Sequence, residues 1–341
     1  MPAEWEPHAA TWLAWPHNHN DWPGKFEPIP WVYCEIIRNL ARHERVELIV
    51  QDAAAERNVR KLLDRANAPL KNVRFHRWRT DRVWLRDSGC IFVRSGSQPL
   101  AANFGFNAWA KYSNWKNDEK IGTLMANAAR TQVARPMHKG TRVVLEGGSI
   151  DVNGRGTLLT TEECLLSKIQ QRNPGMKRED YEKLFACCFG ASHVIWLGEG
   201  IAGDDTHGHV DDLARFVAPD TVVTVVETNL KDENYKPLRE NLHRLKNARD
   251  QSGKLLNIIE IPMPHPVVFE GRRLPASYAN FYIANGIVLV PVFNDAYDRI
   301  ALDTMAALFP RREVVPIYSG DLVWGFGTMH CMTQQQPKST A

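Results

Sequence analysis

The sequence lacks the features that mark three large classes of protein. Its Lys and Arg residues are scattered and form no basic block, so nucleic acid is not an expected partner. No apolar run is long enough to cross a membrane, and the opening MPAEWEPH has neither the charged nor the apolar segment of a secretion signal. We therefore expect no membrane association and a cytoplasmic location.

Cysteine is also scarce, and its pattern gives no framework for disulfides. The six cysteines are irregularly spaced, and Cys187 and Cys188 are adjacent. This pattern favours a reducing compartment over a secreted, disulfide-stabilised domain. Cys and His pairs at tight spacing are missing as well, which argues against a structural zinc site.

What the sequence does contain is a repeated order of predicted elements. A strand, a loop, a hairpin and a helix follow one another about five times along the 341 residues. The first strands of these units are predicted at residues 73–78, 142–145, 193–197, 257–261 and 313–318. Their helices are predicted near residues 118–130, from a capping box of Thr160 and Glu163, near residues 235–249 and at residues 295–309.

The last unit is incomplete, and the N-terminal residues supply what it lacks. An alternating strand at residues 11–15 would pair beside the end of the chain and close the units into a ring without free edges. Two more helices are predicted at residues 31–43 and 52–66, the second capped by Asp52. We therefore expect an α/β fold in which residues 1–341 form one domain, a closed ring of five repeats.

Four loops at equivalent places in these units carry polar residues. They contain Asp87, Glu146, His209 with Asp211, and Cys331. In a closed ring these loops would meet at one end of the central axis, so the repeat predicts one site built from four distant stretches. Taken singly, the signals are weaker. WLRD is also typical of a structural Arg–Asp pair, and a lone Cys is commonly a small buried residue.

Residues 204–212, with the sequence DDTHGHVDD, are the hardest to explain without a function, because four Asp and two His are costly to place near a core. One alternative is a divalent-metal site with nitrogen and oxygen ligands. The other is metal-free, with one His as general acid and base and carboxylates that bind a cation. The second also gives Cys331 a role. Carboxylates bind a guanidinium through paired N–H bonds, and a bound cation favours a thiolate beside it.

Longer segments resemble one known family. They are MPAEWEP, WLRDSG, FNAW, LEGGSI, TLLTTEECLL, DDTHGHVD, NFYIANG and GTMHCMTQQQP. Together and in this order they resemble the agmatine deiminases of the bacterial-type peptidylarginine deiminase family, within the guanidino-group-modifying (pentein) superfamily. The resemblance covers residues 1–337 and implies a five-bladed α/β propeller with pseudo-fivefold symmetry and its active site at the central axis.

The resemblance also implies a reaction and the residues that perform it. Agmatine, a small guanidino cation, would be hydrolysed to N-carbamoylputrescine and ammonia without a metal or other cofactor. Cys331 would be the nucleophile that forms an amidino-cysteine intermediate, and His209 the general acid and base. Asp87 and Asp211 would hold the guanidinium, and Glu146 would bind and orient it beside His209.

The resemblance implies that Trp84 and Trp109 line the pocket. The chain also departs from the family pattern at three positions. Position 90 is Cys where many members have Pro. Phe326 and Thr328 stand where one branch of the family has Gly and Asn. The bulky Phe326 side chain, five residues before the nucleophile, would narrow the pocket.

Several alternatives stay open at this point. The substrate could be arginine, peptidyl-arginine or another small guanidine. Residues 204–212 could instead serve a metal-dependent hydrolase, or the fold could bind a cationic ligand without catalysis. His330 is expected to be structural, and His207 is expected to lie in a wall or at the surface. The sequence is compatible with a homo-oligomer but does not require one.

Overall fold

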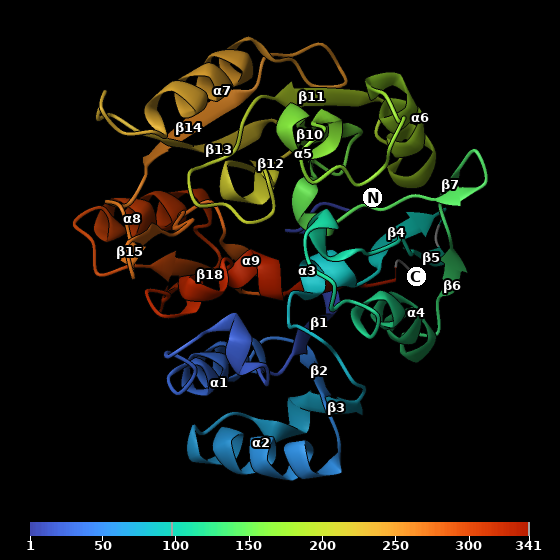
Figure 1. Ribbon diagram of the computed structural model, residues 1–341, viewed down its shortest axis with the longest axis vertical. Helices are drawn as coiled ribbons and strands as arrows, with labels where there is room; N and C mark the ends of the chain where they lie inside the picture. Colours follow the sequence, from blue (N-terminus) through green and yellow to red (C-terminus); the bar gives the residue numbers. More distant parts are fainter. Residues whose placement is uncertain (97, 340–341) are drawn as a thin grey trace.

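The computed structural model describes residues 1–96 and 98–339 of the chain. Within them, five sheets of three or four strands share one connectivity, and two short hairpins stand apart from these sheets (Figure 1). In each of the five, two antiparallel strands are followed by one or two helices and then by a strand parallel to the second. No hydrogen-bonded ladder joins one of these sheets to another in the described residues.

The first sheet joins the two ends of the chain. Its strand order is β20 (Gln334–Pro337), β1 (His8–Ala14), β2 (Arg45–Val50) and β3 (Val73–Arg77), with helices α1 (Ile29–Leu40) and α2 (Ala53–Arg65) in the connections. β20 runs antiparallel to β1, with Thr11 opposite Gln335. The predicted pairing of an N-terminal strand with the end of the chain is therefore confirmed.

The other four sheets follow in chain order. The second contains β4 (Ile91–Ser95), β5 (Gln98–Ala102) and β6 (Gln132–Ala134) with α4 (Asp118–Ala128), and the third contains β9 (Asp151–Val152), β10 (Thr157–Thr161) and β11 (His193–Leu197) with α5 (Glu162–Leu166) and α6 (Arg178–Phe189). The fourth contains β12 (Ala214–Ala218), β13 (Thr221–Val226) and β14 (Asn257–Pro262) with α7 (Tyr235–Asn247), and the fifth contains β17 (Tyr282–Ala284), β18 (Ile287–Val292) and β19 (Glu313–Tyr318) with α8 (Asp298–Leu308). The two separate hairpins are β7 (Met137–His138) with β8 (Thr141–Arg142), and β15 (Val268–Phe269) with β16 (Arg272–Arg273).

Local sequence explains where several of these elements begin and turn. Asp52 caps α2, because its Oδ1 accepts the N–H groups of Ala54 and Ala55 at 2.8 Å. The predicted Asn-Gly hairpin lies between β17 and β18, and Gly286 takes a left-handed conformation, with φ of 74°, that favours glycine. These features depend on neighbours in the sequence and were predicted from it.

The predicted strand at residues 142–145 is wrong. Only Thr141 and Arg142 lie in a strand there, and the strand parallel to β5 is β6 instead. The Asn173 side chain accepts from the Val144 N–H at 2.8 Å and donates to the Val144 C=O at 2.7 Å. The backbone of Val144 therefore bonds to a side chain rather than to a strand ladder.

The predicted capping box at Thr160 and Glu163 is also wrong. The residue that caps α5 is Thr161, whose Oγ1 accepts the Cys164 N–H at 3.1 Å. The helix ends after one turn or so, and a second helix, α6, follows after a loop of residues 167–177. The sequence analysis did not predict α6.

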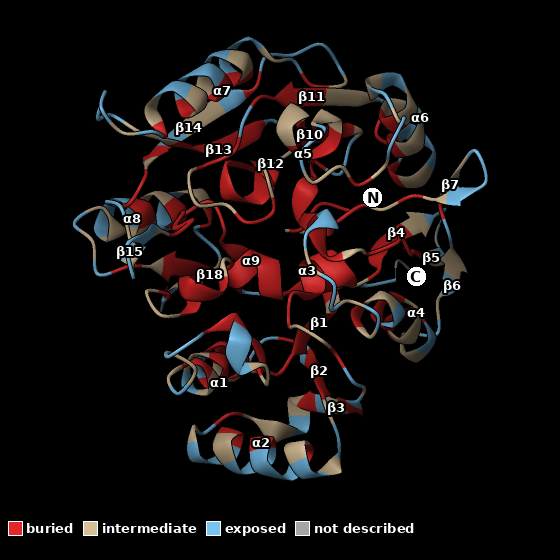
Figure 2. Ribbon diagram, viewed as in Figure 1, coloured by how far each residue is buried: buried red, intermediate tan, exposed pale blue. Residues whose placement is uncertain are grey.

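The core lies between the sheets and the outer helices. Figure 2 shows α3 (Leu85–Ser88) and α9 (Met329–Met332) buried along their whole length, whereas α2 and α7 expose residues along one side. Figure 1 shows α3 and α9 near the centre of the molecule, and the two helices contact each other. In the part of the chain that the structure describes, no helix combines the length and apolar character needed to cross a membrane.

A buried carboxylate ties the N-terminal segment to this centre. The Glu4 side chain lies 3.3 Å from the Arg86 guanidinium, 2.9 Å from that of Arg215 and 2.8 Å from His330 Nε2. It also accepts the Ile283 N–H at 2.8 Å. Burial alone would raise the pKa of Glu4, but Arg215, His330 and Arg86 hold it well below its ordinary value.

We expect the Glu4→Ala substitution to cost about 3–5 kcal/mol in the free energy of unfolding, because it leaves two buried guanidinium groups without their shared partner. Urea unfolding followed by circular dichroism measures the loss. Glu35→Ala is the control, because Glu35 pairs with Arg38 at 3.4 Å with side chains 46% and 43% exposed. That variant should change stability by no more than about 0.5 kcal/mol. Equal losses in the two variants would contradict the assignment of Glu4.

Candidate active site

Four of the five sheets have a short helical turn just before their first strand, where β20 counts as the first strand of the sheet that joins the two chain ends. α3 precedes β4, η4 (Gly147–Ser149) precedes β9, η5 (Val210–Asp212) precedes β12 and α9 precedes β20. α3 contacts both α9 and η4, and η4 contacts η5. The turns bring together the predicted residues from four distant stretches, which are Asp87, Glu146, His209, Asp211 and Cys331.

His209 lies among three carboxylates. Its Nδ1 is 3.8 Å from Asp87 Oδ1 and 4.0 Å from Asp211 Oδ1, and its Nε2 is 3.8 Å from Glu146 Oε2. These distances are too long for hydrogen bonds, so neither ring nitrogen has a partner. Burial would lower the pKa of His209, but the charge of Asp87 and the neighbouring Cys164 and Glu146 raise it well above its ordinary value. The surrounding carboxylates therefore favour the imidazolium over the neutral ring.

Asp87 is held in place by two donors. Trp109 Nε1 donates to Oδ2 at 2.8 Å, and the Gly148 N–H donates to Oδ1 at 3.2 Å. Trp109 itself lies in a run of three residues, from Ala108 to Ala110, that all have φ between 50° and 58°. Such left-handed backbone is costly for residues with a Cβ, and here it aims the indole at the carboxylate. Burial raises the pKa of Asp87 to about 6, against the opposing charge of His209.

Glu146 is paired on one side and free on the other. Arg172, from the loop between α5 and α6, donates from Nε to Glu146 Oε1 at 3.1 Å, and both side chains are fully buried. Burial would raise the pKa of Glu146, but Arg172 and His209 lower it to about 2. Oε2 has no partner and faces His209.

Asp211 has the same one-sided pairing. His330 Nδ1 lies 2.7 Å from Asp211 Oδ2, and the other ring nitrogen of His330 bonds to Glu4. Asp211 Oδ1 is buried and has no partner. Burial would raise the pKa of Asp211, but the bond to His330 and the charges of His330 and His209 lower it. The structural role of His330 stays a prediction, and the structure adds that its ring lies between Asp211 and Glu4.

Cys331 lies beside these carboxylates. Its Sγ is 3.7 Å from Asp211 Oδ2 and accepts the Asn280 Nδ2–H at 3.1 Å. Burial, followed by the charges of Asp211, Asp212 and Asp87, raises the pKa of the Cys331 thiol well above its ordinary value, while Asn280 opposes the shift. Without a cation nearby, the sulfur is therefore a neutral thiol.

A cavity with about 330 Å³ of empty space opens beside the thiol. Its wall includes the predicted Trp84, Asp87 and Trp109, together with Arg82, Asp205, Thr206, Gly325, Phe326 and Cys331. Phe326 has φ of 68°, and the Arg272 guanidinium lies 4.0 Å from the centre of its ring. The expectation that Phe326 narrows the pocket agrees with its place in this wall.

The atoms left without partners define what the site can bind. Glu146 Oε2, Asp211 Oδ1 and both ring nitrogens of His209 are buried and make no hydrogen bond. The cavity wall includes Asp87 and Cys331 but not these three residues, which lie behind it. Buried polar atoms without partners are costly, so such a group beside a cavity indicates a ligand that supplies the missing bonds. Several carboxylates beside a neutral thiol suit a flat cation with N–H donors, such as a guanidinium.

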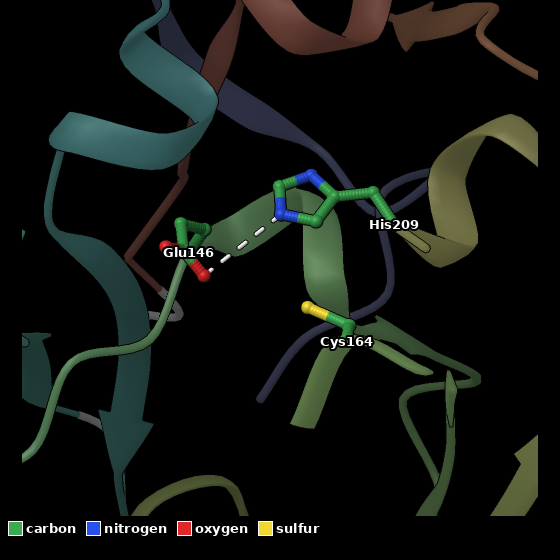
Figure 3. Close-up of side chains that lie close together, drawn as sticks. All are labelled: Glu146, Cys164 and His209. Carbon is green, nitrogen blue, oxygen red and sulfur yellow. Dashed lines mark ion pairs between the residues drawn. The ribbon is translucent and has the colours of Figure 1, made fainter. Parts of the chain in front are cut away.

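The structure also shows which residues could hold a metal ion. Glu146, Cys164 and His209 (Figure 3) place one ligand atom each within 4.8 Å of the others. The same holds for Asp211, Asp212 and Cys331. Carboxylate, thiolate and imidazole are ligands that zinc accepts. The H-x-H pattern of the sequence is not one of these sets, because His207 faces Ser167 at 3.1 Å and Glu163 at 3.5 Å instead.

Three contributors were missed by the sequence analysis. Arg172 lies in a polar loop and gave no signal of a buried role. Glu4 belongs to the motif MPAEWEP, which supported the family resemblance, but the sequence did not indicate a role for the Glu4 side chain. Asn280 had a usable signal, because residues 277–280 precede β17 as the other turns precede their own first strands.

A profile of the Porphyromonas-type peptidyl-arginine deiminase family matches residues 1–337. The chain belongs to this family. It is 35% identical over 361 aligned positions to an agmatine deiminase of Pseudomonas fluorescens, which covers 99% of this chain and 95% of the relative.

Solved structures agree with this assignment. An Enterococcus faecalis agmatine deiminase superimposes with a TM-score of 0.91 at 28% identity, over 100% of this chain and 96% of the other. A cysteine-to-serine variant of C. jejuni agmatine deiminase with substrate bound gives a TM-score of 0.88 at 28% identity, with the same coverage. The mixed α/β fold of these enzymes is thus the fold of this chain.

Gly148 has no room for a side chain. A Cβ at this position would lie 2.6 Å from His209 Nδ1 and 3.0 Å from both Asp211 Oδ2 and Asp87 Oδ1. We expect Gly148→Ala to cost about 1–3 kcal/mol in unfolding free energy, because three buried groups would have to move. Gly198→Ala is the control, since its nearest neighbour would be at an ordinary 3.4 Å. Chemical unfolding of both variants checks this, and a Gly148→Ala protein as stable as the control would contradict the tight centre.

Proposed function

We propose that this chain is an agmatine deiminase, which hydrolyses agmatine to N-carbamoylputrescine and ammonia. The observation that carries the proposal is the set of unpartnered, buried carboxylate oxygens beside the Cys331 thiol and the His209 ring. A guanidinium would supply the missing N–H donors and neutralise the carboxylates. The names of the relatives support agmatine as the guanidine.

The fold that we propose is a single catalytic domain over residues 1–341. It is a five-bladed α/β propeller with the active site on its axis. Five sheets of one connectivity support it, as does the pairing of β20 with β1. The convergence of turns from four of the sheets around His209 and Cys331 supports the axial position of the site. The sequence argument for a cytoplasmic location stays a prediction.

The first half of the reaction forms a covalent intermediate. Asp87 and Asp211 bind the guanidinium N–H groups, and the bound cation favours loss of the Cys331 thiol proton. The thiolate attacks the guanidinium carbon and forms a C–S bond. The His209 imidazolium, held by Glu146, gives its proton to a terminal nitrogen, the C–N bond breaks and ammonia leaves. An amidino group remains on Cys331.

The second half releases the product. Neutral His209 takes a proton from water, and the resulting hydroxide attacks the amidino carbon. The C–S bond breaks, the thiolate returns and N-carbamoylputrescine forms, while the remaining proton ends on ammonia as ammonium. Trp84 and Trp109 line the path of the aliphatic chain. None of these steps uses a metal or an organic cofactor.

We expect ureido product and ammonia from agmatine with EDTA present, and none from the Cys331→Ser variant assayed alongside. The reason is that a serine hydroxyl in this site has no comparable anionic form at neutral pH. Colorimetric detection of the ureido group measures the product, and free arginine and an arginine peptide are run in parallel.

Each other outcome has a defined meaning. Product from arginine or the peptide but not from agmatine would contradict agmatine as the substrate. The deimination mechanism at Cys331 would still hold. Activity that EDTA abolishes, and that survives Cys331→Ser, would contradict the mechanism. It would indicate instead that a bound metal ion performs the hydrolysis.

A further inference from the structure

Asn280 is buried between two groups of the candidate active site. Its Nδ2 donates to Cys331 Sγ at 3.1 Å and to Asp212 Oδ1 at 2.9 Å, and the residue is 1% exposed. It comes from the turn before β17, the one sheet that contributed nothing to the site predicted from the sequence. With Asn280 included, all five sheets place a residue at the centre.

The orientation of the Asn280 amide is fixed by its neighbours. Its Oδ1 accepts from Thr328 Oγ1 at 2.8 Å, from the His330 N–H at 3.0 Å and from the Cys331 N–H at 3.4 Å. An amide nitrogen at that place would face three donors. The NH₂ group must therefore point toward the sulfur and Asp212.

This places a neutral donor where the thiol otherwise faces negative charge. The charged and titratable groups near Cys331 include Asp87, Arg82 and Asp205 in the cavity wall, Asp211 and Asp212 on η5, His209 between Asp87 and Asp211, and His330 on α9. Among the hydrogen bonds of the described residues, the Asn280 amide is the one side-chain donor to Sγ. A hydrogen bond to an ionised acceptor is about twice as strong as one to a neutral acceptor, so this bond favours the thiolate.

We propose that Asn280 is a further catalytic residue, whose amide N–H stabilises the Cys331 thiolate both before attack and when the sulfur leaves the amidino carbon. The proposal deepens the deiminase assignment and rests on it for the reaction. The contact itself can be tested on the free enzyme.

The test measures the alkylation rate of Cys331 by iodoacetamide between pH 7 and 10, with agmatine absent. Mass spectrometry of the peptide that contains Cys331 separates it from the exposed Cys187 and the half-buried Cys188. Asn280→Ala should lower the rate about ten- to hundredfold at pH 7, as expected for loss of a hydrogen bond to an ionised group. Asn280→Asp should lower it further, because it replaces the donor by an acceptor of nearly the same shape.

Asn153→Ala is the matched control. Asn153 is also 1% exposed, and it bonds to the Pro219 carbonyl and to Gln251, outside the site. Unchanged alkylation in both Asn280 variants, or equal losses in Asn280→Ala and Asn153→Ala, would overturn the proposal. If Asn280→Ala fails to fold, the alkylation rate of Cys331 in Asn280→Asp tests the proposal by itself. A thiol effect in a protein that turns over neither agmatine, arginine nor the arginine peptide would keep this contact and reject the deiminase function.

Discussion

The burial of several carboxylates at one point is the constraint on which the rest of this structure depends. Asp87, Glu146 and Asp211 all lie within 4.0 Å of the His209 ring, out of contact with solvent. Buried charges of one sign destabilise the fold unless groups of opposite charge or hydrogen-bond donors pair with them. The chain pairs Glu146 and Asp211 on one side only, through Arg172 and His330. Asp87 accepts a hydrogen bond on each oxygen, from Trp109 and from the Gly148 N–H. The opposite oxygens of Glu146 and Asp211 are thereby left to a ligand.

The repeat of the fold distributes these buried charges over several segments of the chain. A turn before the first strand of each sheet carries one or two polar side chains inward, so no single segment has to contribute all of them. The supporting charges come from further away, as with Glu4 at the N-terminus and Arg172 in the loop after α5. The pairing of β20 with β1 then brings Glu4 and His330 together, although they are 326 residues apart.

The sequence predicted those parts of the molecule that depend on local pattern. Hairpins such as the one at Gly286, the cap at Asp52 and the strand alternation could be recognised from neighbouring residues. The convergence of Asp87, Glu146, His209, Asp211 and Cys331 followed from the equivalence of their loops. The conformation at Val144 and the role of Arg172 were missed because their partners, Asn173 and Glu146, lie 29 and 26 residues away, and local patterns carry no record of such partners. Asn280 was missed although its place before β17 is equivalent to that of the other site residues.

The central claim is that the carbon of the guanidinium becomes bonded to Cys331. It is tested most directly by mixing the protein with agmatine, quenching with acid during turnover and analysing the peptide that contains Cys331 by mass spectrometry. The account predicts an adduct on Cys331 equal in mass to agmatine less ammonia, absent from the Cys331→Ser variant. Sustained turnover in which no such adduct forms, or in which the adduct lies on Cys164, would contradict it.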